Sequence, residues 1–211
     1  STGQKVHGVG IRKCLEALKD DFYSNKNTGL ACAIKNSGVG NGMIDESKVI
    51  IKIISENHVI IEHGWTEMGQ GVHNMAIQTL CEETGIDPGL VDVHVDTEAD
   101  IKTGMTTSSR GTALLGLAII NAAKTIKSDI RKYTLAELSG KEYRGQFICD
   151  WTNKPGDDVD DPVIHYSYGY AAQLCILNPE GTIEKIIAAH DAGKIMNPKL
   201  FEGQIEGGVH M

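Results

Sequence analysis

The sequence predicts an α+β domain in which helices cover mixed sheets and two similar hairpin–helix halves pack around one cleft. The first observation behind this fold class is a repeated order of strand, tight turn, strand, loop and a helix start with Gly-Gln, which occurs around residues 48–70 and again around residues 171–204. The second is the alternation of short β-branched runs, typical of strands, with segments of helical periodicity. We expect approximate halves at 1–140 and 141–211; the alternative is chance reuse of a common hairpin–helix unit.

The first half is expected to begin with an amphipathic helix, because Cys14, Leu18 and Phe22 fall on one helical face. An apolar segment at 30–34 predicts a buried strand. The most apolar segment of the chain, 113–123, predicts a buried core helix and is too short to span a membrane. The expected elements of this half are a helix at 11–23, strands at 30–34, 48–55 and 58–62, a helix that follows Gly71 and ends at Gly85, a strand at 91–95, a helix at 112–132 and a short helical piece at 135–138.

The second half contains two expected long strands joined by a turn. Apolar and aromatic residues predict the first strand, and Asn-Pro-Glu-Gly predicts the turn. A preceding stretch rich in Asp, Gly, Pro and Asn predicts an exposed loop. The expected elements are a strand at 143–150, the exposed loop at 152–162, strands at 163–177 and 182–190 around a turn at 178–181, and a helix start that contains Gly203 and Gln204.

A glycine-rich loop at 64–71 is the first candidate binding site. Gly69 and Gly71 are placed where a helix begins, so that backbone N–H groups lack intrahelical partners and the helix dipole is positive. The absence of Cβ atoms lets a ligand reach the main chain, and Gln70 offers a donor and an acceptor. The pattern predicts binding of an anionic group.

A second candidate binding segment, 103–112, also places hydrogen-bond donors before the start of a helix. It carries hydroxyl side chains, one guanidinium and two glycines directly before the apolar helix. Arg110 can bind a phosphate through two parallel hydrogen bonds, and the hydroxyls of Thr107, Ser108 and Ser109 add uncharged donors. Two such loops predict one phosphate-bearing ligand held between helix N-termini. The alternative is that both are ordinary capped helix starts.

The composition excludes several classes of protein. Among 211 residues, 41% are hydrophobic and 23% charged, which is ordinary for a soluble globular domain. A net charge of −8 argues against a nucleic-acid-binding surface. The five cysteines are widely spaced, lack a Cys-x-x-Cys motif and lie in apolar or periodic segments. This pattern predicts buried free thiols, a reducing cytoplasmic location and no protein-bound metal.

Three motifs, in this order, resemble the molybdopterin-binding region of the xanthine dehydrogenase/aldehyde oxidase family. They are Thr-Glu-Met-Gly-Gln-Gly at 66–71, Thr-Gly-Met-Thr-Thr-Ser-Ser-Arg at 103–110, and Asn-Pro at 197–198 with Gly-Gln-Ile-Glu-Gly-Gly at 203–208. The resemblance covers nearly the whole chain. The first motif, extended back to residue 63, is most similar to that of bacterial selenium-dependent xanthine dehydrogenases.

The resemblance implies a molybdenum hydroxylase, which inserts oxygen from water into a C–H bond of a purine such as xanthine. Another N-heterocycle or an aldehyde is the alternative substrate. It implies a molybdopterin cofactor with molybdenum, in the cytidine dinucleotide form, and electron transfer to iron–sulfur and FAD domains or subunits. By position, the cofactor-binding residues that the resemblance implies are Gly69, Gln70, Gly71, Thr107, Ser108, Ser109, Arg110 and Gln204.

The resemblance assigns neither a catalytic residue nor a metal ligand to this chain. The family's general base lies in a motif beyond the last helix, and the loop and arginine that line the metal lie upstream of Gly8. Glu67 and Glu206 stand at helix starts, where a glutamate more often caps the helix. The histidines show no metal-ligand spacing and are expected on the surface or lining the cleft. We therefore expect a fragment of a longer chain that is inactive by itself.

Two other classes of function stay open. One is a non-catalytic module that binds nucleotides or phosphate through Gln70 and Arg110. The other is a structural segment whose two loops are only helix caps. An apolar surface where missing parts should dock is also expected, so the fragment can self-associate.

Overall fold

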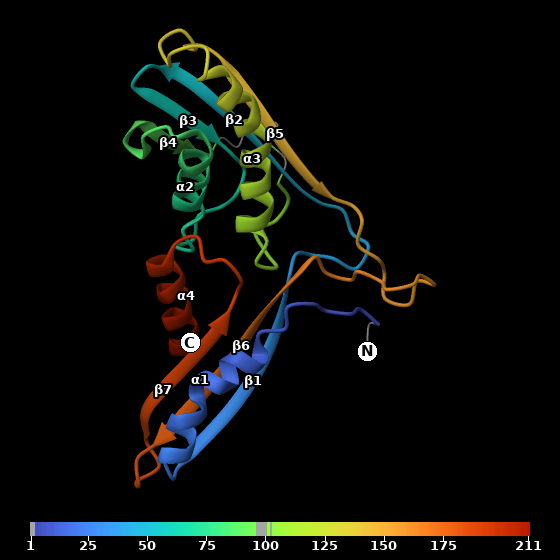
Figure 1. Ribbon diagram of the computed structural model, residues 1–211, viewed down its shortest axis with the longest axis vertical. Coiled ribbons are helices and arrows are strands. Elements are labelled where there is room, and N and C mark those ends of the chain that lie inside the picture. The colour runs from blue at the N-terminus through green and yellow to red at the C-terminus, as the bar shows by residue number, and fades with distance from the viewer. Residues whose placement is uncertain (1–2, 96–100, 102) are drawn as a thin grey trace. The chain divides into compact units, whose positions relative to one another are not determined.

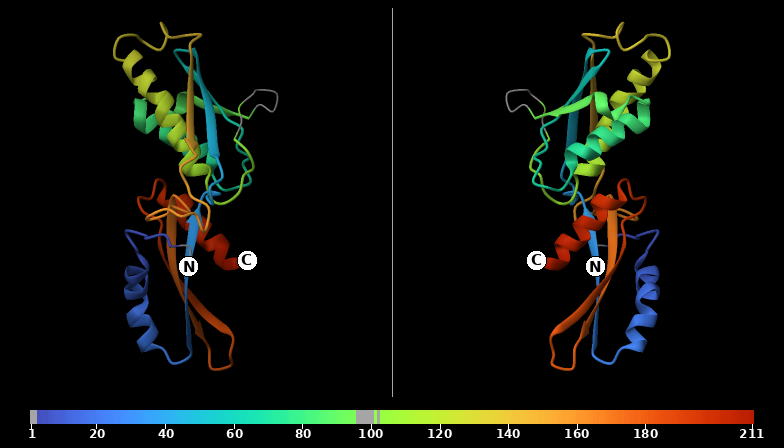
Figure 2. Two further views of the ribbon diagram at one scale, coloured as in Figure 1. Left: turned by 90° about the vertical axis from the view of Figure 1, so that its right-hand side faces the viewer. Right: turned by 90° about the vertical axis from the view of Figure 1, so that its left-hand side faces the viewer.

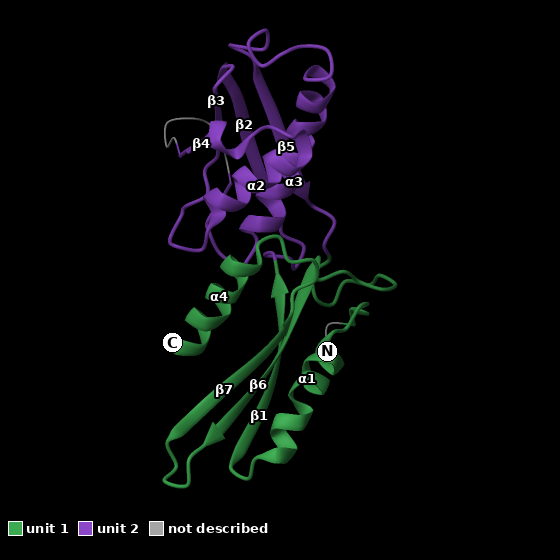
Figure 3. Cartoon of the chain, turned by 60° about the vertical axis from the view of Figure 1, so that its left-hand side comes forward, with its two compact units in different colours: residues 1–37, 153–211 green, residues 38–152 purple. Residues whose placement is uncertain are grey.

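A computed structural model of the chain describes residues 3–95, 101 and 103–211 (Figure 1). The chain divides into two compact units, shown in different colours in Figure 3. Unit 1 comprises residues 1–37 and 153–211, and unit 2 comprises residues 38–152. These boundaries differ from the expected division near 140. The reason is a long-range strand pairing that joins the beginning of the chain to its last third.

Unit 1 contains a three-stranded antiparallel sheet in the order β1-β6-β7. Strand β1 pairs with β6 over its whole length, from Thr28 opposite Ile176 to Ser37 opposite Ser167. Helix α1 lies along one face of this sheet (Figure 2). The elements of unit 1 are α1 (Ile11–Ser24), β1 (Thr28–Ser37), β6 (Ser167–Leu177), β7 (Ile183–Asp191) and α4 (Pro198–His210).

The core of unit 1 forms between α1 and the central strand β6. Cys14 and Leu18 of α1, four residues apart on one face, pack against alternate residues of β6 that include Ala172 and Leu174. The helical period of 3.6 and the strand period of 2 put both sets on facing surfaces. The predicted amphipathic helix is thus confirmed.

Strand β1 corrects one prediction. The apolar segment predicts a buried strand, but β1 is an edge strand whose residues are mostly exposed. Leu30 is 41% exposed, Ile34 is 62% exposed, and Cys32 between them is also exposed. The apolar run identifies a strand correctly, but it cannot show whether anything covers the strand. All five cysteines are free, as predicted; Cys14 and Cys149 are buried, whereas Cys81 and Cys175 are only partly so.

Unit 2 contains a four-stranded mixed sheet in the order β4-β3-β2-β5. Helices α2 and α3 pack against each other on one face of this sheet, as Figure 2 shows. Strands β3 and β4 are parallel and α2 connects them, so β3-α2-β4 is a βαβ unit. The elements of unit 2 are β2 (Asp45–Ser55), β3 (His58–Glu62), α2 (Val72–Thr84), the 3₁₀ turn η1 (Pro88–Leu90), β4 (Val91–His94), α3 (Gly111–Asp129) and β5 (Glu142–Cys149).

The β2–β3 hairpin and both helices of unit 2 follow the sequence pattern. Side chains of Ile51 and Ile61, opposite each other in the register, are fully buried. Gly71 (φ 80°) and Gly85 (φ 79°) bound α2 in the left-handed conformation, and Gly85 N donates to Cys81 O as a helix C-cap. These elements are confirmed because their signals are local.

Two expected elements differ. Residues 135–138 form turns rather than a helical piece, and β6 begins at Ser167 rather than at 163. The residues before Ser167 are held by the side chain of Gln4, whose Oε1 accepts hydrogen bonds from Ile164 N (2.8 Å) and His165 N (3.1 Å). These backbone donors are therefore used outside any strand ladder. Within the described ranges, no helix is both long enough and apolar enough to cross a membrane.

Candidate functional site

The two polar loops predicted from the sequence lie side by side in unit 2. The first loop, residues 63–71, leads from the carboxyl end of β3 into α2, and the second, residues 103–110, leads into α3. Thr66 N donates to Thr106 Oγ1 at 3.2 Å, which joins the loops directly. A Cβ atom at Gly64 would lie 2.7 Å from Ile101 O, so only glycine permits this close approach.

Glu67 occupies the N-terminus of α2 with its own carboxylate. Glu67 Oε1 accepts hydrogen bonds from Gly69 N (2.8 Å) and Gly71 N (2.9 Å), and Oε2 accepts one from His73 N (3.2 Å). Burial raises the pKa of Glu67, but the three backbone donors lower it more, and the net shift is downward. The sequence predicts that the amides of Gly69 and Gly71 are free for a ligand. The structure corrects this: they bind the chain's own anion, and Glu67 is the capping residue that its position suggests.

Gln70 is half-buried in the first loop, with its side chain folded back on the backbone. Its Oε1 accepts from Met68 N at 2.6 Å and its Nε2 donates to Thr66 O at 2.6 Å. Gly69 (φ 98°) and Gly71 on either side have left-handed backbone conformations, which glycine adopts without strain. The loop is therefore ordered through its own side chains.

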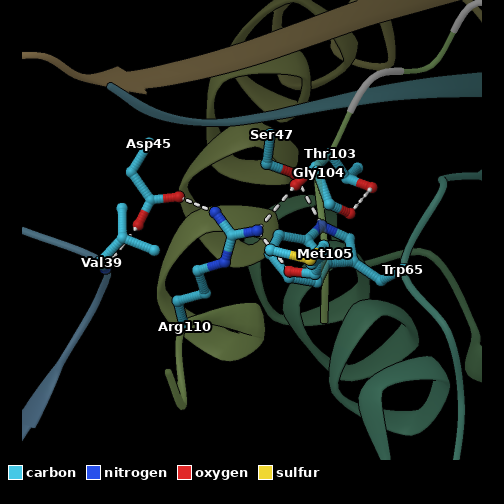
Figure 4. A network of polar contacts seen from close by, with 8 residues as sticks. All are labelled: Val39, Asp45, Ser47, Trp65, Thr103, Gly104, Met105 and Arg110. Atoms are coloured by element: carbon cyan, nitrogen blue, oxygen red, sulfur yellow. Dashed lines mark hydrogen bonds and ion pairs between the residues drawn. The ribbon is translucent and has the colours of Figure 1, made fainter. Parts of the chain in front are cut away.

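Arg110 is buried between the second loop and the start of β2, as Figure 4 shows. Its Nη1 forms an ion pair with Asp45 Oδ1, and its Nη2 donates to Thr103 O (3.3 Å) and to Met105 O. Asp45 Oδ2 in turn accepts from Val39 N at 3.2 Å. The sequence predicts that this guanidinium meets a phosphate. The structure instead places it, 6% exposed, in an internal network that holds the second loop.

The Trp65 ring packs against the guanidinium of Arg110. The guanidinium carbon of Arg110 lies 5.1 Å from the centroid of the Trp65 ring, within cation–π range. Trp65 is fully buried, and its Nε1 donates to Ser47 Oγ at 2.9 Å. Sequence reasoning missed Asp45, Ser47 and Trp65. The one available signal was that a buried arginine requires a carboxylate partner, which nothing local could identify.

The tip of the second loop presents hydroxyl groups to solvent. Thr107 and Ser109 are exposed and Ser108 is half-buried. Ser108 (φ 54°) and Ser109 (φ 50°) both have left-handed conformations, which are uncommon for residues with a Cβ and cluster at binding sites. Ser108 O accepts from Gly38 N at 2.9 Å, which anchors this tip. The hydroxyls therefore lie where a ligand could reach them.

Two histidines lie beneath the first loop. His63 is fully buried, which corrects its expected surface or cleft position; its Nδ1 accepts from Trp65 N at 3.1 Å, and its ring centroid is 5.2 Å from that of His73. Burial and the neighbouring His73 lower the pKa of His63 to about 4, although Glu67 acts in the opposite direction. His63 is therefore neutral at pH 7. In the part of the chain that the structure describes, no cluster of three His, Cys, Asp or Glu residues could hold a metal ion.

Gln204 lies on the exposed side of α4 in unit 1. This helix begins at Pro198, earlier than the expected start at Gly203 and Gln204, because Asn197 Oδ1 accepts from Leu200 N at 3.1 Å and Pro198 occupies the first turn. The expected position of Gln204 across a cleft from Gln70 stays a prediction. The polar side chains of the two loops include the amide of Gln70 and the hydroxyls of Thr107 and Ser109, which bind ligands but do not transfer protons at neutral pH.

Comparison with known proteins gives a consistent result. The model of the family described as "Molybdopterin cofactor-binding domain" matches residues 12–154 and again residues 137–211. A probable xanthine dehydrogenase subunit of Bacillus subtilis is 26% identical over 223 aligned residues, which cover 90% of this chain and 30% of that protein. The xanthine dehydrogenase/oxidase of Gallus gallus is 24% identical, with 97% of this chain and 18% of that protein covered.

Solved structures share the fold. The aldehyde oxidoreductase from Desulfovibrio gigas superimposes with a TM-score of 0.82 at 18% identity, over 98% of this chain and 26% of that one. The corresponding enzyme from Desulfovibrio desulfuricans gives 0.78 at 20% identity, over 94% and 25%. The chain spans less than a third of the length of each of these relatives. It belongs to the molybdopterin cofactor-binding domain family, as a molybdopterin-binding region of the xanthine dehydrogenase/aldehyde oxidase type.

Proposed function

We propose that this chain binds a molybdenum-bearing molybdopterin through the two joined loops of unit 2. The observation that carries the proposal is the Thr66–Thr106 hydrogen bond, because it joins the loop that carries the half-buried Gln70 to the loop that carries the exposed hydroxyls of Thr107 and Ser109. A ligand that touches one loop can therefore touch the other. Membership of the cofactor-binding family supports the same assignment.

The donor set of these loops fits the chemistry of the cofactor. A pterin offers ring nitrogens and a carbonyl, which an amide such as Gln70 can bind, and its tail carries phosphate, which hydroxyl and backbone N–H donors can bind. The second loop leads into α3, whose N-cap residue Arg110 makes no capping hydrogen bond with its side chain and whose first turn has no acidic residue. This helix start is therefore favourable for a phosphate, in contrast to that of α2.

Each predicted residue then has a specific task. Gly69 and Gly71 allow close approach at the first loop, and Gln70 would bind the pterin or its phosphate. Gln204 on α4 is proposed separately as a further cofactor-binding amide. Thr107, Ser108 and Ser109 would hold the phosphate or a cytidine dinucleotide tail. Arg110 contributes indirectly, because its ion pair with Asp45 fixes the loop that carries these hydroxyls.

The names of the relatives support an oxidoreductase of the molybdenum hydroxylase class. When bound, the cofactor supplies the two-electron oxidation that introduces oxygen from water into a C–H bond. We propose a purine such as xanthine as substrate, since two of the relatives are named xanthine dehydrogenases. One of these relatives is named as a subunit, which supports the further proposal of iron–sulfur and flavin partner domains or subunits, in the cytoplasm.

The experiment uses the intact protein isolated from its own cells, with molybdenum measured by mass spectrometry and nucleotide released with acid. We expect about one molybdenum per chain in the unmodified protein, CMP in the acid extract, and loss of most molybdenum in Gln70→Ala. Gln78→Ala, in the body of α2, is the matched control and should retain the metal. A properly matured protein without molybdenum would contradict the proposal. AMP, GMP or no nucleotide would contradict the cytidine form alone.

A further inference from the structure

Glu67 is an anion built into the loop that is expected to receive an anionic cofactor. Its carboxylate binds the amides of Gly69, Gly71 and His73, which are the donors that a phosphate at the N-terminus of α2 would need. Ionised acceptors form stronger hydrogen bonds with backbone N–H groups than neutral acceptors do. A phosphate could therefore bind these amides only by displacing the Glu67 carboxylate, which belongs to the same loop.

The same three hydrogen bonds determine the shape of the loop. Gly69 and Gly71 lack side chains that would restrict the backbone, and both are held in the left-handed conformation. Glu67 Oε1 binds both amides at once and so fixes the two glycines relative to each other. Gln70 lies between them, and its side chain completes the loop by binding Thr66 O and Met68 N. The position of Gln70 thus depends on Glu67.

The two helix N-termini differ in their ability to bind an anion, and this difference determines the orientation of a bound ligand. Helix α2 begins with its first amides occupied by a carboxylate, whereas the side chain of the N-cap residue Arg110 does not cap α3. The two helix starts belong to loops that are joined at Thr66 and Thr106. A ligand with one anionic end and one neutral end would consequently meet the two loops in a single orientation.

We propose that Glu67 is a positioning residue of the cofactor site: it fixes the first loop around Gln70 and keeps the phosphate of the ligand away from the N-terminus of α2. The inference rests on the proposed function, in which the two loops share one cofactor. Under it, the first loop binds the neutral pterin part and the second loop binds the phosphate. Glu67 does not take part in the chemistry.

Three variants of the intact protein test this role. Glu67→Gln keeps the size and one acceptor oxygen but removes the charge, Glu67→Asp keeps the charge on a shorter side chain, and Glu67→Ala removes both. Glu82→Gln is the matched control, because Glu82 lies on the same helix, where its exposed side chain accepts a hydrogen bond from Gln78 Nε2. The first measurement is amide hydrogen exchange at Gly69, Gly71 and His73, and the second is the molybdenum retained after prolonged dialysis.

We expect exchange at these three amides to be about tenfold faster in Glu67→Gln than in the unmodified protein, and faster still in Glu67→Ala. Molybdenum retention should fall in the same order, with Glu67→Asp intermediate and Glu82→Gln unchanged. Equal exchange rates in the unmodified protein and Glu67→Gln would overturn the claim that the carboxylate fixes the loop. Equal retention in all variants would overturn its positioning role.

A third measurement tests the exclusion of phosphate. The intact protein from cells that cannot make molybdopterin is titrated with inorganic phosphate, and the amide signals of Gly71 and His73 are followed by NMR. We expect phosphate to shift them in Glu67→Ala and to leave them unchanged in the unmodified protein. Equal shifts in both proteins would overturn the exclusion. If the unmodified protein never contains molybdenum, the proposed function fails, whereas the exchange and phosphate measurements still report on Glu67.

Discussion

The guanidinium of Arg110 and the carboxylate of Asp45 form an ion pair in which the two side chains are only 6% and 1% exposed. The pair joins the first residue of β2 to the last residue before α3, which are 65 positions apart in sequence. Asp45 Oδ2 accepts from the backbone N–H of Val39, and Arg110 Nη2 donates to the backbone carbonyls of Thr103 and Met105. A buried pair that also binds backbone groups in this way holds a loop in one conformation at the cost of desolvating two charges.

Arg110→Ala should destabilise the protein by about 3 to 5 kcal/mol, because it leaves the carboxylate of Asp45 buried without its cation. Chemical denaturation monitored by circular dichroism measures this change. Arg144→Ala is the matched control, since Arg144 pairs with Glu142 on the exposed surface and should contribute less than about 1 kcal/mol. Equal effects of the two variants would show that the buried pair does not stabilise the second loop.

The buried His63 predicts a loss of stability at mildly acidic pH. Its folded pKa of about 4 lies below the ordinary value of 6.5, so the unfolded chain takes up a proton first as the pH falls. Stability should decline from about pH 6.5 to about pH 4, by roughly 3 kcal/mol from this residue. His63→Asn should flatten this part of the pH profile of urea unfolding. An unchanged slope in His63→Asn would contradict the assignment.

Gly145 on β5 predicts a strong steric effect. A Cβ atom there would lie 2.0 Å from Ala118 O on α3, a backbone atom that cannot move aside without shifting the helix. Gly145→Ala should therefore cost about 3 kcal/mol of unfolding free energy. Gly116→Ala on α3 is the control: its nearest neighbour would be Met75 Sδ at 3.9 Å, and alanine favours helix, so stability should stay equal or rise by about 1 kcal/mol.

The hydroxyls of the second loop should matter for cofactor retention and not for folding. Thr107→Val combined with Ser109→Gly removes both exposed hydroxyls, and glycine suits the left-handed backbone at Ser109. We expect molybdenum retention to fall at least about tenfold while the unfolding free energy changes by less than about 0.5 kcal/mol. Ser128→Ala, at an exposed position on α3, should change neither quantity. A parallel loss of stability and cofactor would indicate that these residues are structural.

The elements that could be predicted are those whose signals are local in sequence. The β2–β3 hairpin, the helix bounded by Gly71 and Gly85, and the buried helix α3 all follow from patterns within a few residues. The capping role of Glu67 belongs to the same group, since its partners are at most six positions away. Both loops could therefore be located from the sequence.

Side-chain partners from distant segments could not be predicted. Arg110 lies among hydroxyls in the sequence, which suggests a phosphate ligand, but in the fold its guanidinium is already paired with Asp45. Similarly, the apolar residues of β1 identify a strand, yet only the sheet order shows that it is at an edge. Burial and pairing are properties of the whole fold, and a single sequence gives no direct measure of them.

The two units differ in the order in which their parts leave the ribosome. Unit 2 is one uninterrupted segment, and its last strand ends at Cys149, before any residue of β6 has been added. Strand β1 is synthesised early, but its partner is complete only when Ile176 and Leu177 have been added. The nascent chain can therefore complete the sheet of unit 2, which carries both loops, before β1 can pair with β6. The two loops can thus fold earlier than unit 1, which contains β1.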